Sequence, residues 1–117
     1  NTMNYEDRKI WKVRTVKEYA DAHNHILVGQ VLESNESYLR LHCKSYHFGK
    51  VVNTPGDVRE GCLMVRIVPW SRVEIINELP NTFSYANAKI TRDQDGTVLL
   101  KDDTYICSLV YQYDRRF

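Results

Sequence analysis

Hydrophobic and polar residues alternate along most of the chain from residue 26 onward, which is the pattern of half-buried β-strands. The alternating stretches are I-L-V-G-Q-V-L-E (26–33), Y-L-R-L-H-C-K-S-Y-H-F (38–48), C-L-M-V-R-I-V (62–68), V-E-I-I (73–76), A-K-I-T-R (88–92), T-V-L-L (97–100) and T-Y-I-C-S-L-V-Y-Q-Y (104–113). Turn-forming segments such as S-N-E-S, T-P-G-D and D-Q-D-G separate them. We therefore expect a mainly β protein with short strands.

The N-terminal residues carry a different pattern. Residues 1–14 fit either a helix or a strand, whereas T-V-K-E from Thr15 to Glu18 has the form of a capping box. Val16, Tyr19 and Ala20 then follow at helical spacing. This region predicts one short amphipathic helix that ends near residue 22.

The long alternating stretch 38–48 predicts which residues enter the core. Leu39, Leu41 and Cys43 share one face of the expected strand, while Tyr38, Arg40 and His42 share the other. We expect the first face to be buried and the second to meet solvent. In the preceding stretch, Gly29 predicts a bend or a close approach between two backbones.

The segment V-P-W-S-R-V-E-I-I (68–76) interrupts a β pattern and resumes it at once. Pro69 has no backbone N–H and cannot continue a central strand ladder. Two strands separated by so few residues must turn a tight corner, as strands do in small closed β-barrels.

Two segments resemble the Sm, LSm and bacterial Hfq-like proteins, a superfamily that binds RNA. G-Q-V-L-E-S-N-E-S-Y-L-R-L resembles the bent second strand, turn and third strand of that family, and M-V-R-I-V-P-W-S-R-V-E-I-I resembles its fourth strand, tight turn and fifth strand. Pro69, Trp70 and Ser71 stand where the family carries Arg-Gly or Lys-His pairs. The resemblance implies a small, bent, five-stranded Sm-like (SH3-type) barrel with a short N-terminal helix over residues 15–80. Residues 81–117 would add a C-terminal β-meander, and we expect 1–117 to form one domain.

Composition narrows the range of functions. The 117 residues are 43% hydrophobic and 26% charged with a net charge of +1, so no global positive field favours nucleic acid, and a basic surface would have to be local. Cys43, Cys62 and Cys107 are too widely spaced for a zinc finger or a disulfide framework, which predicts free thiols and a cytoplasmic protein. No apolar run approaches the length that spans a bilayer, so we expect no membrane association.

Candidate chemistry is sparse. His23 and His25 could bind a metal but have no third ligand nearby in sequence, and His42 and Cys43 should point to opposite faces of one strand. A Cys43 thiol on the core face would be desolvated and unreactive. Because no catalytic or nucleotide-binding motif occurs, we expect neither an enzyme, a metal site nor a cofactor.

Two functions are compatible with this pattern. The first is binding of single-stranded RNA through aromatic and basic groups at the barrel loops, for which the candidate residues are Tyr38, Arg40, Trp70 and Arg72. The second is a structural module that uses the barrel only for assembly, since the Tyr-rich last strand suggests a covered edge or an interface.

In either case we expect a homo-oligomer, which could be a ring. In the family that the chain resembles, the fourth strand of one subunit pairs with the fifth strand of the next. Those strands would be L-M-V-R-I-V and V-E-I-I here, and a charge placed at Ile75 should disrupt the contact.

Overall fold

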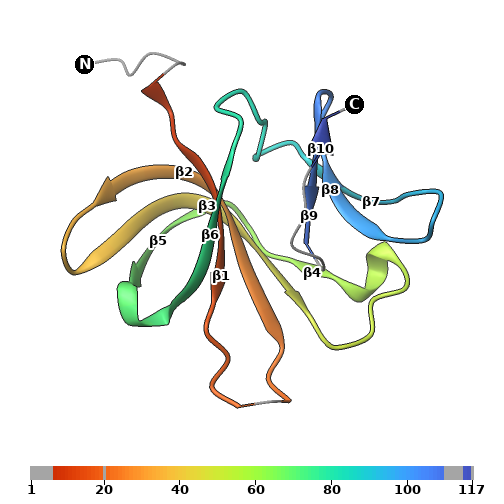
Figure 1. The fold of residues 1–117 in the computed structure, drawn as a ribbon, viewed down its shortest axis with the longest axis horizontal. Helices are drawn as coiled ribbons and strands as arrows, with labels where there is room; N and C mark the ends of the chain where they lie inside the picture. The colour runs from red at the N-terminus through yellow and green to blue at the C-terminus, as the bar shows by residue number, and fades with distance from the viewer. Residues whose placement is uncertain (1–6, 20, 110–114, 117) are drawn as a thin grey trace.

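The computed structural model describes residues 7–19, 21–109 and 115–116, and these form two antiparallel β-sheets. The first sheet has the order β4-β3-β2-β1-β6, and β5 pairs with β3 beyond the stretch that β4 occupies (Figure 1). Its strands are β1 (Ile10–Thr15), β2 (Asn24–Ser34), β3 (Tyr38–Phe48), β4 (Arg59–Glu60), β5 (Met64–Pro69) and β6 (Val73–Leu79). The 3₁₀ turns η2 (Pro55–Asp57) and η3 (Trp70–Arg72) precede β4 and β6.

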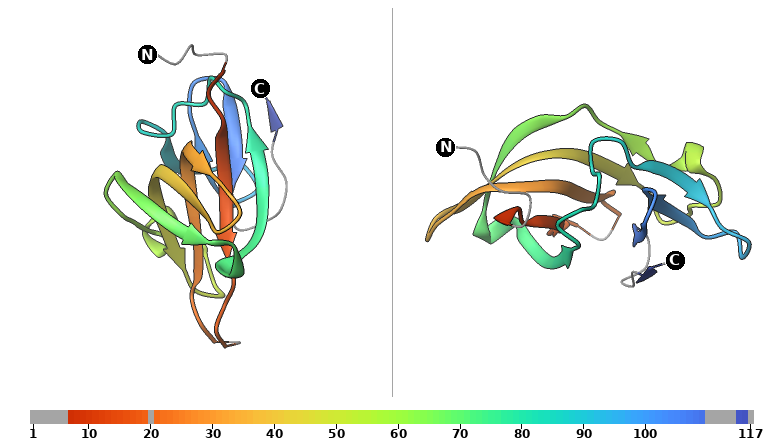
Figure 2. Two further views of the ribbon diagram at one scale, coloured as in Figure 1. Left: turned by 90° about the vertical axis from the view of Figure 1, so that its left-hand side faces the viewer. Right: turned by 90° about the horizontal axis from the view of Figure 1, so that it is seen from above.

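The second sheet is the C-terminal meander. It has the order β10-β9-β8-β7 and consists of β7 (Lys89–Arg92), β8 (Val98–Lys101), β9 (Tyr105–Ser108) and β10 (Arg115–Arg116). In Figure 1 and in the right-hand view of Figure 2, this sheet lies to the right of β1. The predicted meander is therefore present, although the last part of the expected strand 104–113 lies outside the described residues.

The predicted N-terminal helix is wrong. The described residues contain no α-helix, and β1 continues through Thr15, the residue expected to cap that helix. Thr15 is buried beside Val73, and its hydroxyl donates to the carbonyl of His25 at 3.3 Å. The backbone N–H of Val16 likewise donates to the carbonyl of Arg72. Pairing with two neighbouring strands thus outweighs the local helical preference.

Strands β2 and β3 form a long hairpin whose register depends on a bulge. The pairing begins at Ser34↔Leu39, next to the turn, and its register shifts by one residue between Val31 and Glu33. Gly29 lies directly opposite Cys43, and a Cβ at this position would collide with the His42 carbonyl and the Cys43 Cα. The predicted close backbone approach at Gly29 is therefore confirmed.

The tight corner after Val68 is confirmed as well. β5 ends at Pro69, η3 makes the turn, and β6 crosses to pair with β1 from Val73 onward. However, no ladder joins β5 to β6 among the described residues, and the two strands form opposite edges of the sheet. The predicted closed barrel is thus not found, and the assignment to the Sm-like class remains a prediction.

The two faces of the first sheet carry separate hydrophobic cores. The smaller core contains six buried residues, Val13, Leu27, Leu39, Leu41, Cys43 and Val68, with Trp11 and Trp70 packed against it. The inter-sheet core, between the first sheet and the meander, contains fourteen: Ile10, Ile26, Val28, Tyr46, Phe48, Val58, Leu79, Phe83, Tyr85, Ala88, Val98, Leu100, Cys107 and Leu109.

These cores confirm the prediction that one face of β3 is buried and correct the prediction that the other face meets solvent. Leu39, Leu41 and Cys43 are fully buried, as the alternation predicts. On the opposite face, Tyr46 and Phe48 are also buried, and the His42 ring contacts Tyr85 edge-on. The expected solvent face is therefore partly covered, because the meander packs against it.

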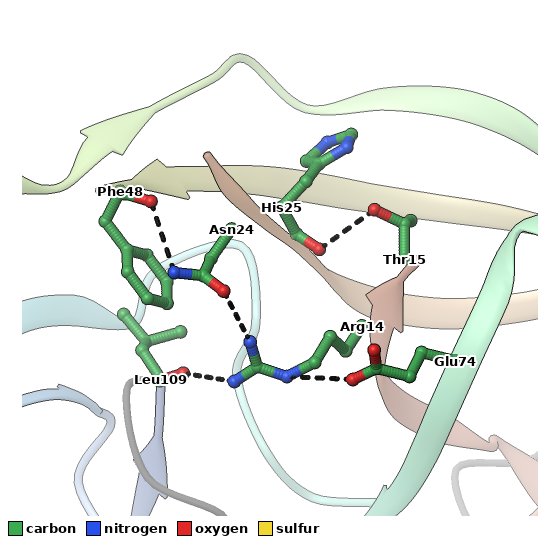
Figure 3. Close-up of polar contacts among 7 residues, drawn as sticks. All are labelled: Arg14, Thr15, Asn24, His25, Phe48, Glu74 and Leu109. Carbon is green, nitrogen blue, oxygen red and sulfur yellow. Dashed lines mark hydrogen bonds and ion pairs between the residues drawn. The ribbon is translucent and has the colours of Figure 1, made fainter. Parts of the chain in front are cut away.

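Polar contacts of β1 tie the meander to the first sheet. Arg14 donates to Asn24 Oδ1 and to the Leu109 carbonyl, each at 3.1 Å, and lies 4.0 Å from Glu74 (Figure 3). The buried Lys12 donates from Nζ to the Ser108 carbonyl at 2.8 Å. Charge-assisted bonds to buried carbonyls are among the stronger hydrogen bonds in proteins, so these two side chains hold the end of the meander in place.

Candidate functional site

The candidate residues Tyr38 and Trp70 meet at one corner of the first sheet. Asn35, in the turn between β2 and β3, accepts from the backbone N–H groups of Ser37 and Tyr38 through its Oδ1. Its carbonyl accepts from Trp70 Nε1 at 2.6 Å, and the Trp70 backbone N–H donates to the Ser37 carbonyl. The β2–β3 turn and the η3 corner are thus bonded to each other.

The polar atoms of both aromatic residues are already engaged in these local contacts. The Tyr38 hydroxyl donates to Glu33 Oε1 at 3.1 Å, and the Trp70 ring packs against the smaller core. An acidic side chain beside Tyr38 opposes the approach of a phosphate. Part of what Trp70 does is therefore structural: it fixes the corner and covers the end of the smaller core.

The two candidate arginines lie in different surroundings. Arg40 is paired in register with Ile67 of β5, close to the corner. Arg72 forms an ion pair with Glu18 at 3.3 Å and lines a pocket with His25. The observed contacts therefore link Tyr38 with Trp70, while Arg72 belongs to a neighbouring pocket.

The histidines form a pair that the sequence interpretation missed. The His25 and His47 rings stack, with centroids 4.1 Å apart and an interplanar angle of 23°. Burial lowers the pKa of His25 from 6.5 to about 4, helped by the nearby cations His47, Arg66 and Arg72. The pKa of His47 is lowered for the same reasons, first by burial and then by Arg66. Both rings are consequently neutral at physiological pH.

Metal binding and thiol chemistry find little support in the geometry. Within the described residues, no three His, Cys, Asp or Glu side chains are grouped so that they could hold a metal ion. His42 points away from Cys43 and bonds through Nδ1 to the Tyr85 hydroxyl at 2.7 Å. Burial raises the pKa of Cys43 to about 11, although Arg66 partly offsets this, so the thiol is protonated as expected.

Comparisons with protein-family models, with curated proteins and with solved structures return no match for this chain. In the part of the chain that the structure describes, no helix is long and apolar enough to cross a membrane. The surfaces of the molecule itself are therefore the basis for inferring its function.

Proposed function

We propose that this chain is a non-catalytic, Sm-like assembly module, in which β5 of one copy pairs with β6 of the next. One observation carries the proposal: β5 and β6, on opposite edges of the first sheet, are apolar and exposed. β5 pairs only with β3 and β6 only with β1 among the described residues, so each has a free edge of backbone N–H and C=O groups.

The exposed apolar side chains gather on these edges. Met64, Val65 and Ile67 of β5 are 45%, 49% and 62% exposed, and Ile75 of β6 is 42% exposed. Long, apolar edge strands promote pairing with another chain unless charges or prolines protect them. β5 has one charged residue, Arg66, and a proline only at its last position, Pro69, so the part from Met64 to Val68 has little protection of this kind.

The two edges also complement each other. Ile67 pairs in register with Arg40, and Ile75 pairs with Arg14; both lie on the face of the sheet that the meander partly covers. A head-to-tail contact between β5 and β6 would therefore extend one continuous apolar face.

The test is the mass of the assembly in solution. Ile67→Lys and Ile75→Lys each place a charge at the proposed contact, and sedimentation should show both variants as monomers while the wild type sediments as an oligomer. Because both positions are exposed, the variants should keep the circular dichroism of the wild type. Val51→Lys is the matched control, since Val51 is 71% exposed and lies in a loop away from both edges. A monomeric wild type would refute the proposal.

Binding of single-stranded RNA is the second candidate function. It is favoured by the corner that joins Tyr38 and Trp70 near Arg40, because aromatic and basic groups together can bind bases and phosphates. U-rich and A-rich oligonucleotides should then bind with an affinity that falls as salt increases. Arg40→Gln should weaken this binding, whereas Arg92→Gln in the distant hairpin should not. No binding at low salt would exclude this function.

A further inference from the structure

A pocket of about 200 Å³ opens at the end of the smaller core, beyond the Trp70 corner. β1, β2, β5 and η3 all contribute to its lining, and its polar residues are Thr15, His25, Arg66 and Arg72. A water molecule occupies about 30 Å³ in the liquid, so the pocket has room for a larger polar group. Figure 3 shows the His25 ring pointing away from the Arg14 cluster, and hence away from the inter-sheet core.

Two buried nitrogen atoms at this pocket have no hydrogen-bond partner in the described part of the chain. Neither His25 Nε2 nor Arg66 Nε forms a hydrogen bond with any of residues 7–19, 21–109 or 115–116. Buried polar atoms in native proteins are nearly always bonded, because an unsatisfied one is costly. The Arg66 Nε–H is a donor at any accessible pH, so its natural partner is an acceptor.

The positive charges around the pocket also favour an acceptor as the partner. His25 faces His47, Arg66 and Arg72, and His47 faces Arg66, His23 and Arg59. The acidic groups beside this set are already engaged. Glu18 pairs with Arg72 at the surface, and Asp57 accepts from the backbone N–H groups of Asn53 and Thr54.

We propose that this pocket binds a small oxyanion of the phosphate class, with Arg66 and Arg72 as its charged donors and His25 as a donor when protonated. Guanidinium groups present planar forks of N–H donors that match oxyanions. The pocket borders the β5 edge, since Arg66 and Ile67 belong to that strand, but anion binding there requires neither RNA binding nor assembly.

Anion binding at this pocket must be coupled to protonation of His25. In the free protein the neighbouring cations and burial oppose the charged ring, and its pKa is about 4. A bound anion stabilises the imidazolium, so the pKa of His25 must rise on binding. The affinity therefore increases as the pH falls through the pKa that His25 has in the complex, and it levels off below the value of about 4 in the free protein.

The experiment follows the His25 ring by NMR while inorganic phosphate is added. The pH titration of its ring proton is compared in phosphate and in chloride at equal ionic strength, and we expect phosphate to raise the pKa by at least one unit. Calorimetry at pH 6 measures the Kd, with glycerol phosphate as a second probe to compare a phosphomonoester with free phosphate. Arg66→Gln should raise the Kd at least tenfold. Arg92→Gln removes the same charge from an exposed hairpin and should change it less than twofold.

Circular dichroism checks that each variant is folded. If Arg66→Gln does not fold, the exposed end of Arg72 allows Arg72→Gln to take its place, with the same expected loss of affinity. The proposal is overturned if phosphate leaves the His25 titration unchanged, or if Arg92→Gln weakens binding as much as the pocket variant does.

Discussion

The two hydrophobic cores use opposite faces of the same strands, but they are completed in different ways. The inter-sheet core has fourteen buried residues and is covered by the chain's own C-terminal sheet. The smaller core has six, is covered at one end by Trp70, and ends in a pocket where His25 and Arg66 have polar atoms without partners among the described residues. β5 and β6, whose outer edges are unpaired among the described residues, place Val68, Val73 and Ile76 at the smaller core and Ile67 and Ile75 on the other face. The difference indicates that the meander stabilises the molecule, whereas the smaller core and its edges are available for interaction.

The largest expected effect tests whether the two cores unfold together. Phe83→Ala removes a fully buried ring from the inter-sheet core and should lower the free energy of unfolding by about 3–5 kcal/mol. Trp11 and Trp70 both pack against the smaller core, so their fluorescence reports on it alone. In Phe83→Ala, the denaturation midpoint measured by tryptophan fluorescence should fall together with the midpoint measured by far-UV circular dichroism. Val51→Ala, at an exposed position, should change the stability by no more than about 0.5 kcal/mol.

If the tryptophan midpoint stays unchanged in Phe83→Ala while circular dichroism shows a separate early transition, the meander folds independently. The two cores would then belong to two units that unfold separately.

Gly29→Ala tests how closely the hairpin that both cores share is packed. Its Cβ would collide with backbone atoms of His42 and Cys43, which cannot move aside without disturbing β3. We expect a loss of about 3 kcal/mol in urea denaturation. Gly49→Ala is the control, since the nearest atom to its Cβ would be His23 Nε2 at 3.9 Å. Equal effects of the two substitutions would contradict the packing argument.

Acid should weaken the smaller core through its histidine pair. The pKa of His25 is about 4 in the folded protein and about 6.5 when unfolded, so the unfolded state binds more protons between these values. The contribution of His25 to the free energy of unfolding is therefore fully present above about pH 6.5 and falls as the pH decreases towards 4.

From pH 7.5 to 5.0, in chloride without phosphate, we expect the His25 contribution to fall by about 1–2 kcal/mol, reduced from the full linkage value because the ring is only half-buried. The measurement is the urea midpoint at each pH. His25→Gln should lose less stability than the wild type over this range; the same loss in both proteins would assign the effect to other groups.

The smallest expected effect compares two hydroxyl groups in the inter-sheet core. Tyr85 bonds to His42 Nδ1 at 2.7 Å, so Tyr85→Phe should cost about 1 kcal/mol. The Tyr46 hydroxyl is buried without a partner among the described residues, so Tyr46→Phe should leave the stability unchanged or raise it slightly. Thermal denaturation of both variants separates the cases. A loss in Tyr46→Phe as large as that in Tyr85→Phe would show that this hydroxyl is bonded after all.

Much of the strand pattern could be predicted from the sequence because it depends on local alternation and on turn residues. β3 runs from Tyr38 to Phe48 as expected, and the Pro69 corner and Gly29 were recognised from constraints on a single residue. The N-terminal helix was mispredicted because Thr15 and Val16 satisfy their hydrogen bonds in the sheet, through partners distant in sequence.

The histidine pocket could not be predicted, for a physical reason. Counting back from the β2–β3 turn places His25 opposite Phe48, but the bulge after Val31 shifts the register by one residue and brings His25 opposite His47. A shift of one residue moves every side chain of a strand relative to its partners, and nothing local in the sequence marks this bulge. The RNA-binding role of the candidate residues stays a prediction. Tyr38 and Trp70 both bond to Asn35, while Arg72 pairs with Glu18 and lines the pocket.

The central position of β1 has a consequence for how the chain folds. β1 is synthesised before the other described strands, yet it pairs with β6 and bonds through Lys12 and Arg14 to Ser108 and Leu109, more than 90 residues later. Contacts between residues so far apart in sequence form late, because a long loop must close first, and they slow folding. During synthesis the β2–β3 hairpin can form early, but β1 keeps one edge unpaired until residues 73–79 emerge. We therefore expect refolding to be slow for a chain of this length, and a newly made chain to have an exposed β1 edge that is prone to aggregate.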